Sequence, residues 1–164
     1  MPKSEGKPRT RLDLADNAKK ASIEVLQGVL TDSIDLYNST RQAHWNVKGP
    51  QFHSLHTLFE TFYTQMETDI DEIAERLVQL GGTAMGTSQS VAGGTRLAPY
   101  PAGIRQGSEH LHALLERYCA AARTVREGID ATDEAGDADT ADLLTGVSRN
   151  LDKAVWMMEA TAEG

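Results

Sequence analysis

The chain has 164 residues, of which 16 are basic and 24 acidic, so its formal net charge at pH 7 is −8. That length suits a single domain with its own apolar core. No apolar run approaches the roughly 18 residues of a membrane span, and the N-terminus lacks the apolar segment of a secretory signal. The one cysteine, Cys119, makes no internal disulfide, and its Ala-rich surroundings predict a small core residue. We therefore expect a cytoplasmic protein without a membrane anchor.

The charge is divided unevenly along the chain. Side chains of residues 1–11 sum to +3, which leaves −11 on the remainder. Residues 1–12 hold two of the five prolines and few large apolar groups, so we expect a flexible basic arm, followed by one folded domain over residues 13–164. A basic arm on an acidic body indicates two different partners. The basic side chains of the arm are Lys3, Lys7, Arg9 and Arg11.

Two long helices are predicted in the first half of the chain. Apolar residues recur at helical spacing over residues 16–46, and we expect Asp16 or Asn17 to cap this helix. A second helix, over residues 51–80, has the cleanest apolar period and stops at two consecutive glycines.

The second half continues the helical pattern after a long break. Residues 83–106 are rich in Gly, Ser, Thr and Pro, and a connection of that length is usually functional or a crossover. Helices are predicted over residues 107–130 and 140–162, with an acidic turn over residues 130–139 between them. The fold class is therefore all-α, a ferritin-like four-helix bundle with its long crossover between helices two and three.

The second predicted helix carries a polar stripe beside its apolar face. Two pairs within the stripe have i,i+4 spacing, His56 with Glu60 and Asp71 with Glu75, so each pair can present two donors to one cation. Imidazole combined with carboxylates suits iron, zinc or manganese. The alternative is a solvated acidic face with a structural histidine. The members of the stripe are His53, His56, Glu60, Glu67, Asp71 and Glu75.

The distance between the pairs limits how they can act. Fifteen residues separate His56 from Asp71, which is about 22 Å along a helix, so one metal ion cannot bridge them within one chain. Either each pair is a half-site, or two chains complete each other. The numbering favours the second arrangement, because a two-fold axis near residue 65 or 66 sets His56 opposite Glu75 and Glu60 opposite Asp71. His44 can add a third donor by folding back across the turn.

These residues lie in two long motifs that resemble the Dps family (DNA-binding proteins from starved cells). The second motif is followed by further similarity in the predicted last helix, at residues 139–156. The resemblance covers residues 15–162 and identifies the chain as similar to ferritin-like proteins. The motifs read His44-Trp45-Asn46-Val47-Lys48-Gly49 with Leu55-His56 and Glu60, and Ile70-Asp71-Glu72-Ile73-Ala74-Glu75-Arg76 with Leu80-Gly81-Gly82.

The resemblance implies a hollow homododecamer with ferroxidase centres at its two-fold interfaces. Each centre is expected to hold two iron ions, with zinc as a possible substitute, and to oxidise Fe²⁺ preferentially with H₂O₂ and more slowly with O₂. One subunit would supply His44 and His56, and its partner Asp71 and Glu75. Glu60 stands where many members have Asp. Trp45 beside the site would trap stray oxidising equivalents, the alternative being that it packs the interface.

Two further groups of residues follow from the resemblance. It places the acidic turn near three-fold ion channels, where Glu134, Asp137 and Asp142 would draw cations inward. It also assigns non-specific, phosphate-mediated DNA binding to the basic arm and a nucleoid-associated location to the protein. The alternative function is a DNA-compacting nucleoid protein whose iron chemistry is secondary.

One sequence match belongs to a different pattern. Ordinary ferritins place Glu-x-x-His on two helices of one chain, and this chain has a single match, from Glu109 to His112. Without its counterpart the match predicts surface residues. His53 shares the stripe of helix two but is not part of the Dps motif.

Overall fold

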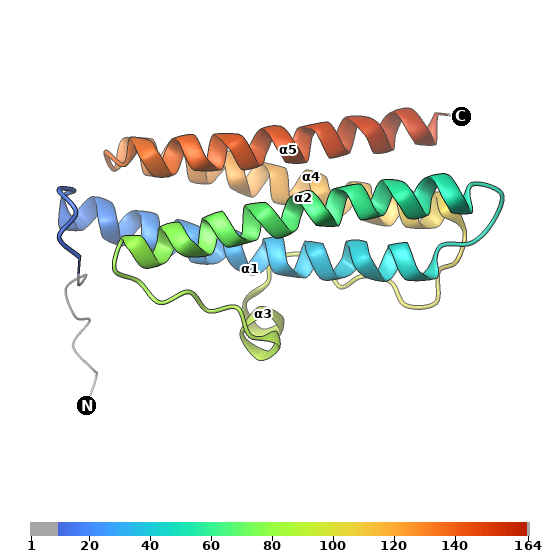
Figure 1. The fold of residues 1–164 in the computed structure, drawn as a ribbon, viewed down its shortest axis with the longest axis horizontal. Helices are drawn as coiled ribbons and strands as arrows, with labels where there is room; N and C mark the ends of the chain where they lie inside the picture. The colour runs from blue at the N-terminus through green and yellow to red at the C-terminus, as the bar shows by residue number, and fades with distance from the viewer. Residues whose placement is uncertain (1–9, 164) are drawn as a thin grey trace.

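A computed structural model describes residues 10–163 of the chain, and within that range it contains helices and no strand. The long helices lie side by side as a bundle, with a short helix beside them (Figure 1). No helix in residues 10–163 is long and apolar enough to cross a membrane. The helices are α1 (Asp16–Asn46), α2 (Phe52–Gln79), α3 (Ser88–Gly94), α4 (Gly107–Glu134) and α5 (Ala138–Ala162).

The order of the helices gives the topology expected from the sequence. α1 packs closely against α2, α4 packs closely against α5, and both pairs are antiparallel because short turns join them (Figure 1). The crossover between α2 and α4 runs along the whole bundle, which makes these two helices parallel (Figure 1). The predicted ferritin-like bundle with one long crossover is therefore confirmed.

Three details differ from the prediction. The crossover contains the short helix α3, whose start is capped by the Thr87 hydroxyl, which accepts a hydrogen bond from the Ser90 backbone N–H. α4 extends to Glu134, so the acidic turn shrinks to residues 135–137, with Gly136 at a φ of +89°. α1 begins after Ala15 without a side-chain cap, so neither Asp16 nor Asn17 has the expected role.

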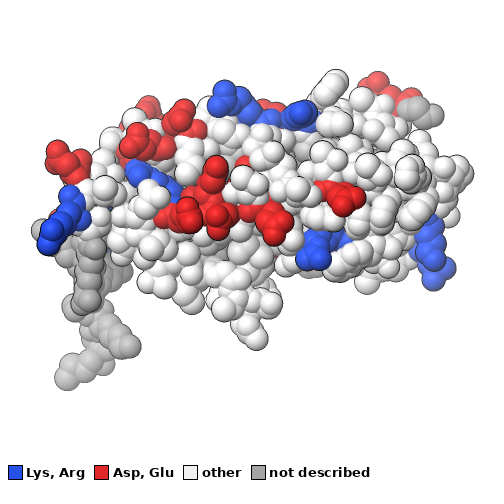
Figure 2. Space-filling model, in the orientation of Figure 1, with Lys and Arg blue, Asp and Glu red and all other residues white. Residues whose placement is uncertain are grey.

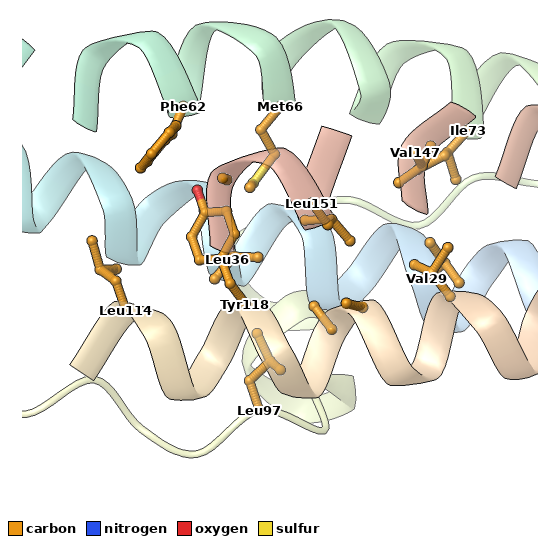
Figure 3. Packing of buried hydrophobic residues seen from close by; sticks show 14 of the residues in the cluster. Val29, Leu36, Phe62, Met66, Ile73, Leu97, Leu114, Tyr118, Val147 and Leu151 are labelled. Atoms are coloured by element: carbon orange, nitrogen blue, oxygen red, sulfur yellow. The ribbon is translucent and has the colours of Figure 1, made fainter. Parts of the chain in front are cut away.

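The core fills the space between the four long helices along their length. Side chains from α2, α4 and α5 meet around Tyr118 (Figure 3), whose hydroxyl lies 3.0 Å from the Thr40 hydroxyl. Burying a large apolar side chain contributes about 1.5–3 kcal/mol. The largest fully buried members include Leu26, Leu36, Phe59, Leu77, Leu114, Tyr118 and Met158.

The crossover is held against α1 by a buried carboxylate. Asp32 is buried and accepts hydrogen bonds from the Arg96 backbone N–H at 2.8 Å and from Arg96 Nε at 2.9 Å. The Arg96 guanidinium lies directly over Gly28, where an added Cβ would be 3.0 Å from Arg96 Nη2. The glycine inside α1, which costs helix stability, therefore makes room for this contact.

Candidate functional site

His44 at the end of α1 and His56 at the start of α2 form a stacked pair. The turn between the helices folds α2 back on α1, which brings the two rings to a centroid distance of 3.7 Å and an interplanar angle of 17°. His44 Nδ1 lies 2.7 Å from the His56 carbonyl oxygen, and His56 Nδ1 lies 2.8 Å from the His44 carbonyl oxygen. Each residue therefore fixes the ring of the other.

These reciprocal hydrogen bonds determine the tautomer of each ring. A carbonyl oxygen only accepts, so each Nδ1 carries the hydrogen and donates it. In the neutral imidazoles both Nε2 atoms then keep their lone pairs, which is the form that binds a metal ion. Metal-binding histidines ordinarily donate their other ring N–H to a carbonyl or carboxylate in this way. The tautomer of both His44 and His56 is therefore the one that leaves Nε2 able to bind a metal ion.

Aromatic rings and one arginine surround the histidine pair. The Tyr63 ring meets the His44 ring edge-on, with centroids 5.3 Å apart. The Arg41 guanidinium lies 4.9 Å from the Trp45 ring centroid, 5.4 Å from that of Tyr37 and 5.7 Å from that of Tyr63. Burial, with a further contribution from the nearby Glu60 carboxylate, raises the pKa of Tyr63. Trp45 itself is 63% exposed.

The carboxylates of the stripe are all exposed on α2. Glu60 lies one turn after His56, whereas Asp71 and Glu75 lie in the last third of the helix. Within residues 10–163 the single chain brings together no group of three or more His, Cys, Asp or Glu side chains around a metal position. The structure thus joins His44 to His56 but does not join them to Asp71 and Glu75.

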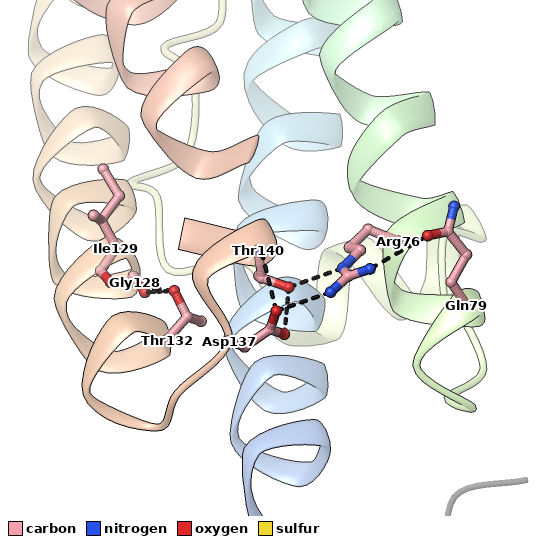
Figure 4. Close-up of polar contacts among 7 residues, drawn as sticks. All are labelled: Arg76, Gln79, Gly128, Ile129, Thr132, Asp137 and Thr140. Carbon is pink, nitrogen blue, oxygen red and sulfur yellow. Dashed lines mark hydrogen bonds and ion pairs between the residues drawn. The ribbon is translucent and has the colours of Figure 1, made fainter. Parts of the chain in front are cut away.

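The end of α2 that carries Asp71 and Glu75 is fixed to the start of α5 by Arg76 (Figure 4). Arg76 Nη2 lies 2.8 Å from Asp137 Oδ1, and Arg76 Nε donates to the Thr140 hydroxyl at 3.0 Å. The Thr140 hydroxyl in turn donates to Asp137 Oδ2 at 2.5 Å. This network links the C-terminal end of α2 to the N-terminal end of α5.

Asp137 is consequently not the channel residue that the sequence suggested. It is 1% exposed and caps α5, where Oδ1 accepts from the Thr140 backbone N–H at 3.1 Å. Burial opposes its ionisation, but hydrogen bonds from Thr140 and the nearby Arg76 guanidinium lower the pKa of Asp137 below its ordinary value. The Asp137 carboxylate is therefore used in contacts within the bundle, with Arg76 and Thr140. Glu134 and Asp142, in contrast, are exposed.

Acidic side chains gather on part of the surface that Figure 2 shows, over the C-terminal half of α2 and the N-terminal part of α5. The opposite end of this face is mostly uncharged (Figure 2). Of the predicted DNA-binding residues, Arg11 is exposed, and Lys3, Lys7 and Arg9 lie outside the described residues.

Sequence analysis missed two residues beside the histidine pair, Tyr63 and Arg41, and it misplaced Cys119 elsewhere in the chain. Tyr63 follows His56 by seven positions and Glu60 by three, so helical spacing alone could have placed it beside the stripe. Arg41 precedes His44 by three positions and had the same signal. Cys119 is exposed rather than in the core. Glu109 and His112 of the Glu-x-x-His match are exposed as predicted, while His110 between them is buried.

Comparison with known proteins places the chain among ferritin-like proteins. A ferritin-like domain model matches residues 23–163. A "DNA protection during starvation protein" of Agrobacterium fabrum is 51% identical over 152 residues, which cover 93% of this chain and 94% of that protein.

Solved structures agree with the sequence match. DpsC from Streptomyces coelicolor superposes with a TM-score of 0.90 at 28% identity, covering 93% of this chain and 90% of that chain. A Dps protein of Vibrio cholerae, described as belonging to a superfamily of ferritin-like diiron-carboxylate proteins, gives a TM-score of 0.88 at 25% identity, covering 96% of this chain and 98% of that chain.

Proposed function

Because this chain belongs to the Dps family of ferritin-like proteins, we propose that it forms a homododecameric cage that oxidises Fe²⁺ and stores the ferric product. In this proposal two copies meet about a two-fold axis along α2. His44, His56 and Glu60 of one subunit then face Asp71 and Glu75 of the partner subunit. Each two-fold interface has two such sites, because symmetry makes both contacts at once.

The reciprocal histidine pair is the observation that carries this proposal. Its two Nε2 lone pairs are oriented by hydrogen bonds inside one subunit, so no ordering is needed when Fe²⁺ arrives. Glu60 adds a carboxylate one turn away, and the two carboxylates of the partner complete a mixed imidazole and carboxylate set that suits iron and accepts zinc as a substitute.

In this proposal H₂O₂ is the preferred oxidant. Two Fe²⁺ ions supply the two electrons that H₂O₂ needs to become two water molecules, with the consumption of two protons. Holding both ions at one interface lets both electrons pass without release of a hydroxyl radical, and O₂ serves as a slower oxidant. Trp45 lies next to the histidine pair under the Arg41 guanidinium, in a position to donate an electron to any stray oxidant.

Mixed assembly tests whether the site is shared between subunits. Chains with His56→Ala and chains with Glu75→Ala are each expected to lose rapid anaerobic Fe²⁺ oxidation by H₂O₂. When the two are co-assembled at equal amounts, half of the two-fold pairs are mixed and each mixed pair has one intact site, so about a quarter of the native activity returns.

A matched variant and the co-assembled sample together distinguish a shared site from a site within one chain. His53→Ala removes an exposed histidine from the same helix and should keep full activity. A site contained in one chain would leave the co-assembled sample inactive, and that result would overturn the proposal.

Binding of DNA is a second candidate function of the same cage. The named relatives include DNA protection proteins, and the arm contributes a side-chain sum of +3 per chain. Twelve arms could combine weak phosphate contacts into avidity without sequence specificity. In this proposal the protein works in the cytoplasm, in contact with the nucleoid.

A further inference from the structure

A pocket lies between α2 and α5, with its floor on α4. Its α2 residues, from Thr61 to Asp69, follow an i,i+4 spacing on a helix face different from the stripe of His56 and Asp71. The cavity volume is about 100 Å³. Figure 3 shows that Phe62, Met66, Leu151 and Tyr118 converge there. The apolar walls and floor are Phe62, Met66, Tyr118, Leu151, Ala154 and Met157.

One acidic side chain, Asp69, lines this pocket. It is 6% exposed. Its Oδ1 accepts hydrogen bonds from Gln65 Nε2 at 3.1 Å and from Asn150 Nδ2 at 2.9 Å. Both donors are neutral, and within residues 10–163 neither a hydrogen bond to Oδ2 nor an ion pair to Asp69 is present. A buried carboxylate is ordinarily paired with a cation, so Asp69 leaves one oxygen available to a positive group that enters the pocket.

Lys153 is the basic residue of the pocket lining, and it makes no ion pair with Asp69. Its side chain is on the exposed surface. Lys153 therefore stands beside the entrance as a competing cation rather than as the partner of the carboxylate.

We propose that this pocket binds the ammonium end of a small primary alkylamine, outside the iron chemistry of the protein. The N–H groups of the ammonium would donate to Asp69 Oδ2, and the methylene groups would contact Phe62, Tyr118 and the methionines. A cavity of about 150 Å³ accommodates benzene, so this one accepts about four heavy atoms, the size of propylammonium. A single carboxylate flanked by amide N–H donors does not suit a divalent metal, which needs several oxygen ligands.

Propylammonium is the direct probe, measured by saturation-transfer NMR and by calorimetry on the assembled protein at physiological salt. We expect saturable binding of one molecule per chain, and none for propionate, which has similar size and opposite charge. Two sources share this chemistry, a free amine and a lysine side chain of another polypeptide. Nα-acetyl-lysine methylamide as a second probe distinguishes them, because tighter binding of that probe identifies lysine as the natural occupant.

Three variants locate the binding. Asp69→Asn keeps both hydrogen bonds to the amide oxygen and removes the charge, so it should weaken propylammonium at least tenfold. Glu72→Gln removes an exposed carboxylate one turn away and should change the affinity less than twofold. Lys153→Met removes the competing cation and should leave the affinity equal or higher. The proposal fails if the native protein shows no saturable binding, or if Asp69→Asn and Glu72→Gln have the same effect.

Discussion

The five histidines show how local contacts decide what one residue type does. His44 and His56 donate from Nδ1 to each other's carbonyl oxygens, which leaves both Nε2 atoms outside this pair of hydrogen bonds. His53 and His112 are exposed. His110 is buried at the start of α4, where its Nδ1 lies 2.6 Å from the Tyr100 hydroxyl of the crossover.

His110 predicts a loss of stability in mild acid. Burial lowers the pKa of His110 below its ordinary value, so the unfolded chain binds more protons as the pH falls through about 6.5. The free energy of unfolding then decreases as the pH falls toward the lowered pKa. The midpoint of thermal unfolding, compared at pH 7.5 and 5.5, should fall by a few degrees more in the native protein than in His110→Phe. Equal losses in the two proteins would contradict this role.

At the scale of the helices, close packing depends on where the glycines lie. Gly128 in α4 faces α1 and α5, and an added Cβ would be 2.8 Å from Val25 Cγ1 and 3.3 Å from Leu144 Cδ1. Gly146 in α5 faces open space, with no atom within 4 Å of an added Cβ. A larger side chain would therefore clash at Gly128 but would fit without contact at Gly146.

We expect opposite effects from replacing these two glycines. Gly128→Ala should lower the free energy of unfolding by about 1 kcal/mol, because the overpacking strain exceeds the gain in helix propensity. Gly146→Ala should raise it by about 0.5–1 kcal/mol, because only the propensity changes. Chemical denaturation followed by circular dichroism measures both. Stabilisation by both substitutions would show that α4 is not tightly packed on its neighbours.

At the scale of the whole molecule, the acidic surface bears on the entry of iron. Under the proposed assembly, Glu134 and Asp142 ring each three-fold channel, and their negative potential concentrates cations there. Replacing Glu134 with Gln and Asp142 with Asn should slow Fe²⁺ uptake several-fold, while oxidation of Fe²⁺ already inside is unchanged. Stopped-flow absorbance before and after preloading separates the two steps. The matched control, Glu159→Gln with Glu163→Gln, removes the same charge from the far end of α5, and an equal slowing there would argue against a channel.

The basic arm and the acidic body oppose each other in DNA binding. Deleting residues 2–11 should abolish the shift of duplex DNA in a gel, and the shift of the native protein should weaken steeply between two salt concentrations, because released counterions drive the binding. Replacing the four basic residues of the arm with Gln keeps its length and should have the same effect as the deletion. Undiminished binding after either change would exclude the arm as the contact.

Periodicity alone determined the number, type and connection of the long helices. Apolar residues every three or four positions give each helix one apolar face that must be buried. Lys48-Gly49-Pro50 cannot continue a helix, so a turn between two helices is expected there. The ends of the helices were harder to predict, because several neighbouring residues at each end can serve as the cap. Asp137 caps α5 through the local Thr140, and its carboxylate is also bound by Arg76 of α2, which lies 61 positions earlier in the chain.

Helical spacing proposed the members of the candidate site, and the structure of the single chain brings His44 and His56 together but not Asp71 and Glu75. Spacing identified His56, Glu60, Asp71 and Glu75 because helix geometry repeats along the chain. Only the tertiary structure decided which ring nitrogen of His44 and His56 is used in a hydrogen bond, that Asp137 is buried, and that Asp69 lines a pocket. Those properties depend on which helices touch and on the rotamers that packing selects, and helical spacing does not specify either.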